Sequence, residues 1–86
     1  MVIKTHRNFD KQFAKLSQKQ RKKVEVSLTL FMKNPHAAKL RRHALTGKYS
    51  GHYSISAGSD LRLHFRYLSS DTVIFTAVGS HAQLYK

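Results

Sequence analysis

The chain contains no cysteine and no tryptophan, and only one proline and four acidic residues occur among its 86 positions. Without cysteine there is no disulfide, no thiolate zinc site and no cysteine nucleophile. No apolar run approaches the roughly 18 residues of a membrane span, and no secretory signal is recognisable at the N-terminus. We therefore expect a cytoplasmic protein that does not contact a membrane, folded as a single domain over residues 1–86.

Positive charge is what the chain has in excess. Sixteen lysines and arginines against four acids give a formal net charge of +12 and an isoelectric point near 10.5. Hydrophobic residues make up 41% of the chain, which is enough for a two-layer fold and too many for a disordered basic tail. Such a charge requires a polyanionic or acidic partner, so we expect nucleic acid, an acidic protein, or both.

The first half of the chain predicts one strand and two helices. Residues 2–6 are β-prone, and apolar residues then recur at helical spacing after Asn8, a candidate N-cap. A longer helix is expected to start at Ser17 and to end before Pro35, because the residue preceding proline disfavours the helical conformation. Residues 35–47 are basic and predict a loop with one helical turn.

The second half has a period of two, which is typical of strands. Strands are predicted over residues 53–57 and 61–67, separated by a turn, and the apolar run 73–78 predicts a strand buried on both faces. The order β-α-α-β-β-β predicts an α+β fold in which an antiparallel sheet packs against a helical hairpin.

Side-chain alternation places Arg62, His64 and Arg66 on the face of the sheet opposite the helices, where they would form a basic floor. An ordinary solvated face is the alternative reading. Metal-free RNA cleavage needs a base, an acid and cations for the phosphorane, and histidine and arginine suit these roles. The candidates for proton transfer are His43, Asp60, His64 and His81. No histidine spacing is typical of zinc, so we expect neither a metal nor another cofactor.

Three segments, 46–55, 60–65 and 79–85, resemble the RelE/ParE superfamily of bacterial toxins, and more closely its YafQ-like branch of mRNA interferases. The resemblance covers nearly the whole chain and implies the toxin of a type II toxin–antitoxin system. Such a toxin is neutralised by an antitoxin encoded beside it. The free toxin enters the ribosomal A site and cuts mRNA, which leaves a 2′,3′-cyclic phosphate and a 5′-OH.

The resemblance also implies site residues. The residues that match catalytic positions are His43, Asp60, Arg62, His81 and Tyr85. Charge and position add Arg41, Arg42, His64 and Arg66 as residues expected to contact RNA, and Lys48 is a looser match to basic residues of the family. Leu61, Ser56 and Ala77 depart from the YafQ pattern, which has a tryptophan, a second histidine and an arginine there.

Two other functions remain open from the sequence. One is a ParE-like toxin that inhibits DNA gyrase, and the other is a non-catalytic basic RNA-binding domain. Cleavage would require His43, Asp60, His81 and Tyr85 to converge on one concave face, whereas the alternatives do not. For a toxin, we expect an acidic antitoxin segment to cover the basic floor of Arg62, His64 and Arg66.

Overall fold

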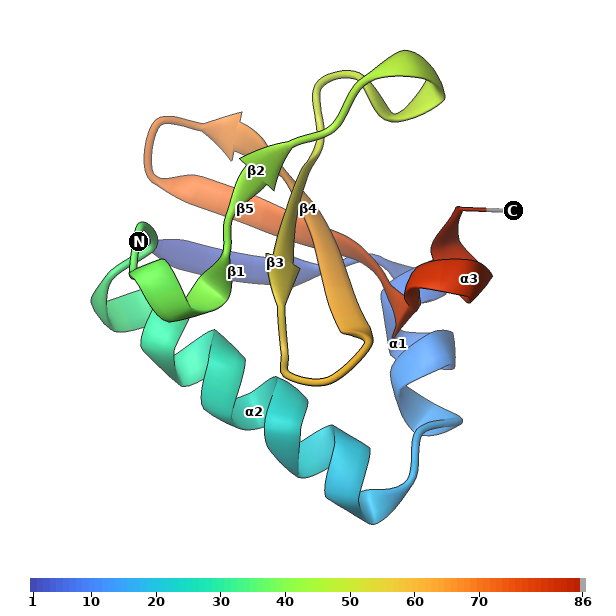
Figure 1. Cartoon of the computed structure of the whole chain (residues 1–86). Coiled ribbons are helices and arrows are strands. Elements are labelled where there is room, and N and C mark those ends of the chain that lie inside the picture. Colours follow the sequence, from blue (N-terminus) through green and yellow to red (C-terminus); the bar gives the residue numbers. More distant parts are fainter. Residues whose placement is uncertain (86) are drawn as a thin grey trace.

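Two helices lie across one face of a five-stranded sheet in the computed structural model, which describes residues 1–85 (Figure 1). The α+β class is confirmed. The elements, in chain order, are β1 (Val2–Thr5), α1 (Arg7–Ala14), α2 (Gln18–Lys33), the 3₁₀ turn η1 (Ala38–Leu40), β2 (His43–Ala44), the 3₁₀ turn η2 (Gly47–Tyr49), β3 (Tyr53–Ser56), β4 (Leu61–Ser69), β5 (Thr72–Ser80) and α3 (His81–Leu84). No helix in this part of the chain is long and apolar enough to cross a membrane.

The sheet contains the predicted antiparallel meander, but it is mixed, because its first strand pairs in parallel, which was not predicted. Its strand order is β1-β5-β4-β3-β2, in which β2 to β5 form an antiparallel meander and β1 runs parallel to β5. Parallel pairing needs a long crossover between the paired strands. Here the whole segment from α1 to β4 separates β1 from β5. It brings the chain back so that β5 runs in the same direction as β1.

Strand β5 is fully buried on only one face, which corrects the expectation of burial on both. Val73, Phe75 and Val78 are buried, whereas Ile74 and Thr76 are only half-buried. The helices cover the first set. The other face is covered only in part, and it is the face on which the candidate site lies.

Helix α1 begins two residues earlier than predicted, because His6 rather than Asn8 is its N-cap. The His6 side chain accepts a hydrogen bond from the Asn8 backbone at 3.0 Å. The Asn8 side chain instead donates to the Thr76 carbonyl at 3.0 Å, and Gln12 accepts from the Val78 backbone at 2.8 Å. Because β1 ends at Thr5, the last part of β5 has no strand beside it on this edge. Side chains of α1 make hydrogen bonds to the β5 backbone there.

Helix α2 has the predicted ends. Ser17 and Gln20 form a reciprocal capping box, and the helix ends at Lys33, two residues before the proline. Its Phe31 lies edge-on to Phe65 and Phe75, with ring centroids 4.9 and 5.4 Å apart. Phe9 of α1 contacts the same Phe75 ring at 6.0 Å, so both helices pack on one face, as expected.

Two short elements that the sequence did not reveal shape the opposite face. Strand β2 pairs His43 with Ser54 at the edge of the sheet. Helix α3 folds back against the end of β5, where Ser80 and Gln83 form a second capping box. A Cβ at Gly79 would lie 2.9 Å from the Gln83 Oε1, so the missing side chain gives Gln83 its place. This arrangement makes His81 the first residue of α3.

Candidate functional site

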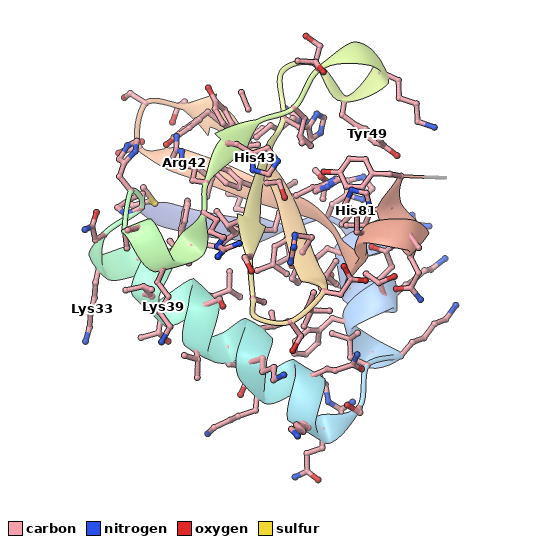
Figure 2. The ribbon with its side chains drawn as sticks, in the orientation of Figure 1. Lys33, Lys39, Arg42, His43, Tyr49 and His81 are labelled. Atoms are coloured by element: carbon pink, nitrogen blue, oxygen red, sulfur yellow. The ribbon has the colours of Figure 1, made fainter. Side chains whose placement is uncertain are left out.

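A hollow of about 350 Å³ lies on the face of the sheet opposite α2. It is lined by His43, Arg62, His81 and Tyr85, together with Ala44, Leu45, Thr46 and Tyr49. Figure 2 shows His43 on β2, Tyr49 on η2 and His81 on α3 on the same side of the sheet. Four of the five residues predicted to be catalytic therefore come together, from three separate elements.

His43 is an exposed residue whose ring is oriented by the backbone. Its Nδ1 lies 3.1 Å from the Arg41 carbonyl oxygen. A carbonyl oxygen only accepts hydrogen bonds, so in this contact Nδ1 carries the proton. The neutral ring then has an unprotonated Nε2, which is able to take a proton from a substrate in the hollow.

His81 is exposed and is backed by an aromatic cluster. Its ring centroid lies 4.5 Å from that of Tyr85, at an interplanar angle of 36°. The Tyr85 hydroxyl is 3.0 Å from the His64 Nε2, and the Tyr49 hydroxyl donates to the Leu84 carbonyl at 2.7 Å. These contacts attach the four-residue helix α3 to the sheet and thereby fix the position of His81.

His64 is buried, so the predicted basic floor of Arg62, His64 and Arg66 does not exist as one surface. Only 2% of His64 is exposed, and the rings of Tyr49 and Tyr85 lie against it at 5.4 and 5.3 Å. Burial, followed by the nearby imidazoles of His52 and His43, lowers the pKa of His64 to about 4. His64 is therefore neutral near pH 7. Its cover consists of η2 and α3, neither of which was predicted from the sequence.

The lowered pKa of His64 predicts how stability depends on pH. The unfolded chain takes up this proton near pH 6.5, whereas the folded protein does so only near pH 4. Between these values the folded state binds fewer protons, so the free energy of unfolding decreases as the pH falls. The expected loss, complete below the folded pKa, is as much as about 3 kcal/mol.

Urea unfolding across this pH range measures the loss. The matched control is a His64→Gln variant, which has no titrating ring at this position. Its unfolding free energy should depend less on pH than that of the wild type. The same acid dependence in both proteins would contradict the assignment to His64.

Arg62 forms one wall of the hollow. Its Nη1 donates to the carbonyls of Ser59 and Leu61, both at 3.1 Å, and contacts the Ser56 hydroxyl at 3.4 Å. Within residues 1–85, all hydrogen bonds of this guanidinium use Nη1. The rest of the planar group is oriented by these contacts, and it is suited to two oxygens of a phosphate.

Asp60 does not line this hollow, so the expected convergence of all the predicted catalytic residues does not occur. It is exposed in the β3–β4 turn and lines a separate depression with Ser80 and Gln83. The reason lies in the register. Leu61 is the first residue of β4 and pairs with Ser80, so Asp60 falls beyond the end of the sheet.

Three of the predicted RNA contacts, Lys48, His64 and Arg66, line a second hollow of about 600 Å³. Tyr49 lines both hollows and separates them. The Lys48 Nζ lies 5.4 Å from the centre of the Tyr49 ring, which is a cation–π contact. A polyanion that crosses Tyr49 would therefore meet positive charge on both sides.

Arg42, which was predicted to contact RNA, does not line the hollow and lies on the other face of the sheet. Its guanidinium lies 4.8 Å from the Tyr53 ring centre, and its Nη2 donates to the Tyr67 hydroxyl at 3.0 Å. Successive side chains of a strand alternate, so His43 faces the hollow and Arg42 does not. Arg41 is exposed but lines depressions beside η1 instead of the hollow.

Tyr49 lies at the centre of the site, whereas the sequence alone suggested only a ring able to stack on RNA bases. It shares the 46–51 segment with two glycines at positive φ, and nothing in its spacing indicates that its ring contacts both His64 and Tyr85. The sequence signal for its importance is an aromatic residue in a basic, glycine-containing loop.

No group of three potential metal ligands assembles within residues 1–85.

Comparison with known proteins places the chain in a family. A family model described as the bacterial toxin of a type II toxin–antitoxin system, YafQ, matches residues 1–86. The crystal structure of YafQ from E. coli strain BL21(DE3) is similar, with a TM-score of 0.79 and 26% identity over 98% of this chain and 97% of that chain. No curated protein sequence matches the chain.

Two toxin–antitoxin complexes are also similar. The toxin in the E. coli DinJ–YafQ complex gives a TM-score of 0.76 at 26% identity, over 98% of this chain and 96% of that chain. The RelB–RelE complex from Methanococcus jannaschii gives 0.74 at 19% identity over 95% and 94%, which shows a shared fold. Because the family model spans the whole sequence, we conclude that this protein belongs to the YafQ family of bacterial type II toxins.

Proposed function

We propose that this toxin is an endoribonuclease that cleaves mRNA on the ribosome without a metal ion. The observation that carries the proposal is the hollow in which His43, His81 and Arg62 meet. Two imidazoles supply a base and an acid that operate near neutral pH, and the guanidinium supplies a fixed positive charge. Neither a gyrase inhibitor nor a simple RNA-binding domain needs this combination.

In the proposed reaction, the Nε2 of His43 takes the proton from a ribose 2′-OH. The 2′-oxygen then attacks the adjacent phosphorus, and the bond from phosphorus to the 5′-oxygen breaks. His81, in its protonated form, donates a proton to that leaving oxygen. The products are a 2′,3′-cyclic phosphate and a 5′-OH, so no water and no cofactor is consumed.

Arg62 stabilises the charge that develops on the phosphorane oxygens in this scheme. Its Nη1 is already bonded to the β3–β4 turn, so little reorganisation is needed when the charge forms. Tyr85 positions His81 through the contact between their rings, and the neutral His64 holds the Tyr85 hydroxyl. Lys48 and Arg66 bind phosphates further along the strand, beyond Tyr49.

The partners follow from the same charge. A formal charge of +12 suits binding to ribosomal and messenger RNA in the cytoplasm. The DinJ–YafQ complex is the precedent for a protein partner, and we extend it to this chain. A cognate antitoxin of acidic character would bind the free toxin and prevent cleavage.

Expression of the toxin without antitoxin tests the function. We expect growth to stop because translation stops, and mRNA to be cut only when ribosomes are present. Mapping the ends should find 5′-OH and 2′,3′-cyclic phosphate termini. Continued protein synthesis with inhibited DNA gyrase would instead support a ParE-like action, and ribosome binding with intact mRNA would support a non-catalytic role.

A further inference from the structure

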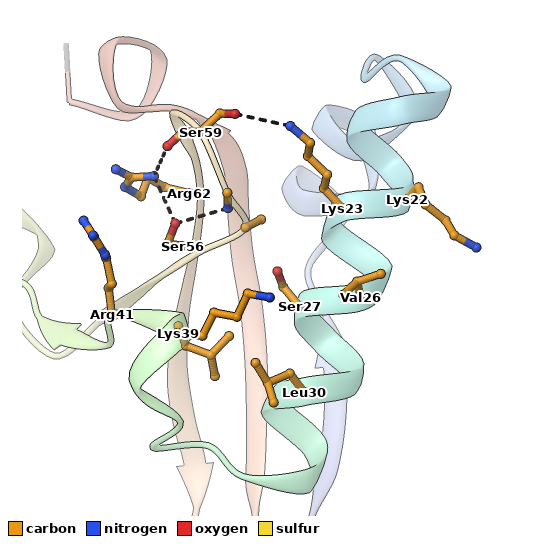
Figure 3. Close-up of a pocket in the computed structure, with 13 residues that line it drawn as sticks. Lys22, Lys23, Val26, Ser27, Leu30, Lys39, Arg41, Ser56, Ser59 and Arg62 are labelled. Atoms are coloured by element: carbon orange, nitrogen blue, oxygen red, sulfur yellow. Dashed lines mark hydrogen bonds between the residues drawn. The ribbon is translucent and has the colours of Figure 1, made fainter.

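A groove separate from the catalytic hollow runs between α2 and η1 (Figure 3). Its volume is about 530 Å³. Helix α2 forms one wall, and η1 with the β3–β4 turn forms the other. We call it the α2–η1 groove. The proposed reaction gives this groove no role.

The rim of the α2–η1 groove is strongly positive. Its cations are Lys22, Lys23, Lys39, Arg41 and Arg62. No aspartate or glutamate is among the residues that line it. Two of the cations are engaged locally: the Lys23 Nζ donates to the Ser59 hydroxyl at 3.2 Å, and the Arg62 Nη1 donates to the Ser59 and Leu61 carbonyls. The excess charge therefore favours an occupant that carries several carboxylates or phosphates.

The floor of the groove is aliphatic, and this property distinguishes a peptide that carries carboxylates from a nucleic acid that carries phosphates. The buried Leu40 and Ala57 and the half-buried Leu30 line the floor, and Val26, which is 57% exposed, adds an aliphatic side chain on the α2 wall. No aromatic side chain lines the groove, so it offers no surface on which RNA bases stack. An apolar floor inside a cationic rim instead fits a peptide that has an aliphatic side chain flanked by acidic residues.

Arg62 connects this groove with the catalytic hollow. It is the one residue that lines both, among those that the structure describes. A carboxylate bound in the groove would pair with the Arg62 guanidinium from the side away from the substrate. That pairing would remove positive charge from the hollow without filling it.

We propose that the cognate antitoxin docks an acidic segment with an aliphatic anchor in the α2–η1 groove and engages Arg62 there. This inference rests on the proposed antitoxin partner. It replaces the expectation that the antitoxin covers Arg62, His64 and Arg66, because His64 is buried. Docking in the groove neutralises the toxin by charge, beside the site and not within it.

Binding of the antitoxin encoded beside the toxin tests the groove. Val26→Asp places a carboxylate on the aliphatic part of the α2 wall, and Lys39→Glu reverses an exposed cation on the rim. We expect each to weaken antitoxin binding at least about tenfold, or 1.4 kcal/mol. Cleavage by the free variants should be unchanged, since neither residue lines the catalytic hollow.

Two matched variants are the controls. Leu68→Asp changes another exposed aliphatic residue (45% exposed), and Lys4→Glu reverses an exposed lysine on β1. Both should alter affinity by less than about threefold. Groove variants that behave like these controls, or that lose ribosome affinity and keep antitoxin affinity, would overturn the groove. A wild-type toxin that fails to bind the antitoxin would overturn the partnership itself, whereas binding without cleavage would overturn only the catalytic proposal.

Discussion

Replacing His81 with alanine should slow single-turnover mRNA cleavage on the ribosome by about 10²–10⁴-fold, the usual contribution of a positioned acid or base. The structure gives His81 the position that such a role requires. It is exposed to the hollow, and its ring is held against Tyr85 at 4.5 Å. Ribosome affinity should change little, because a net charge of +12 supplies that binding through many other side chains.

His81→Lys separates proton transfer from simple charge. Lysine keeps a cation at this position but does not titrate near neutral pH. The lysine variant should therefore cleave mRNA as slowly as the alanine variant. Cleavage rate and ribosome affinity are measured for both variants. Restored cleavage with lysine, or loss of binding together with cleavage in the alanine variant, would show that His81 only contributes electrostatic attraction.

His43 and Asp60 should respond very differently to substitution, which identifies the base. We expect His43→Ala to slow cleavage by about 10²–10⁴-fold, because His43 lines the hollow and the contact of its Nδ1 with the Arg41 carbonyl leaves Nε2 to act as the base. Asp60→Asn should change the rate by no more than about twofold, as is usual for a surface substitution away from the reacting atoms. The two variants are compared in the same ribosome-dependent assay.

The pH profile provides a second readout for His43. If its imidazole is the base, the acidic limb of kcat/KM should disappear in the alanine variant and persist in Asp60→Asn. A large loss in Asp60→Asn with near-normal His43→Ala would reverse the assignment. It would also mean that the β3–β4 turn moves when RNA binds, since Asp60 lies outside the hollow in the free toxin.

Some of the fold was determined by short stretches of sequence. Ser17 and Gln20 form a capping box through contacts three residues apart, and Pro35 ends the helix through its own geometry. The alternation from Leu61 to Phe65 likewise specified a strand and the face of its apolar side chains. Such signals are local, so they can be read without knowing what else surrounds the segment.

Other features depended on partners distant in the sequence. Asn8 appeared to be a helix cap, but its side chain binds Thr76, 68 residues away. Strand β2 has only two residues and exists because Ser54 and Tyr53 pair with it. The parallel pairing of β1 with β5 also has no local signal, since it is decided by where the whole intervening chain returns.

The sequence by itself determined the family, the excess of positive charge and the histidines and arginines from which a metal-free site could be built. Only the tertiary structure decided which of them meet. It brought His43, Arg62 and His81 together, left Asp60 beyond the end of β4, and enclosed His64 behind Tyr49 and Tyr85. The physical reason is that alternation along a strand gives the face of a side chain, whereas its exposure depends on what packs over that face. Here η2 and α3 cover His64 and, by excluding water, make it a neutral support for Tyr85.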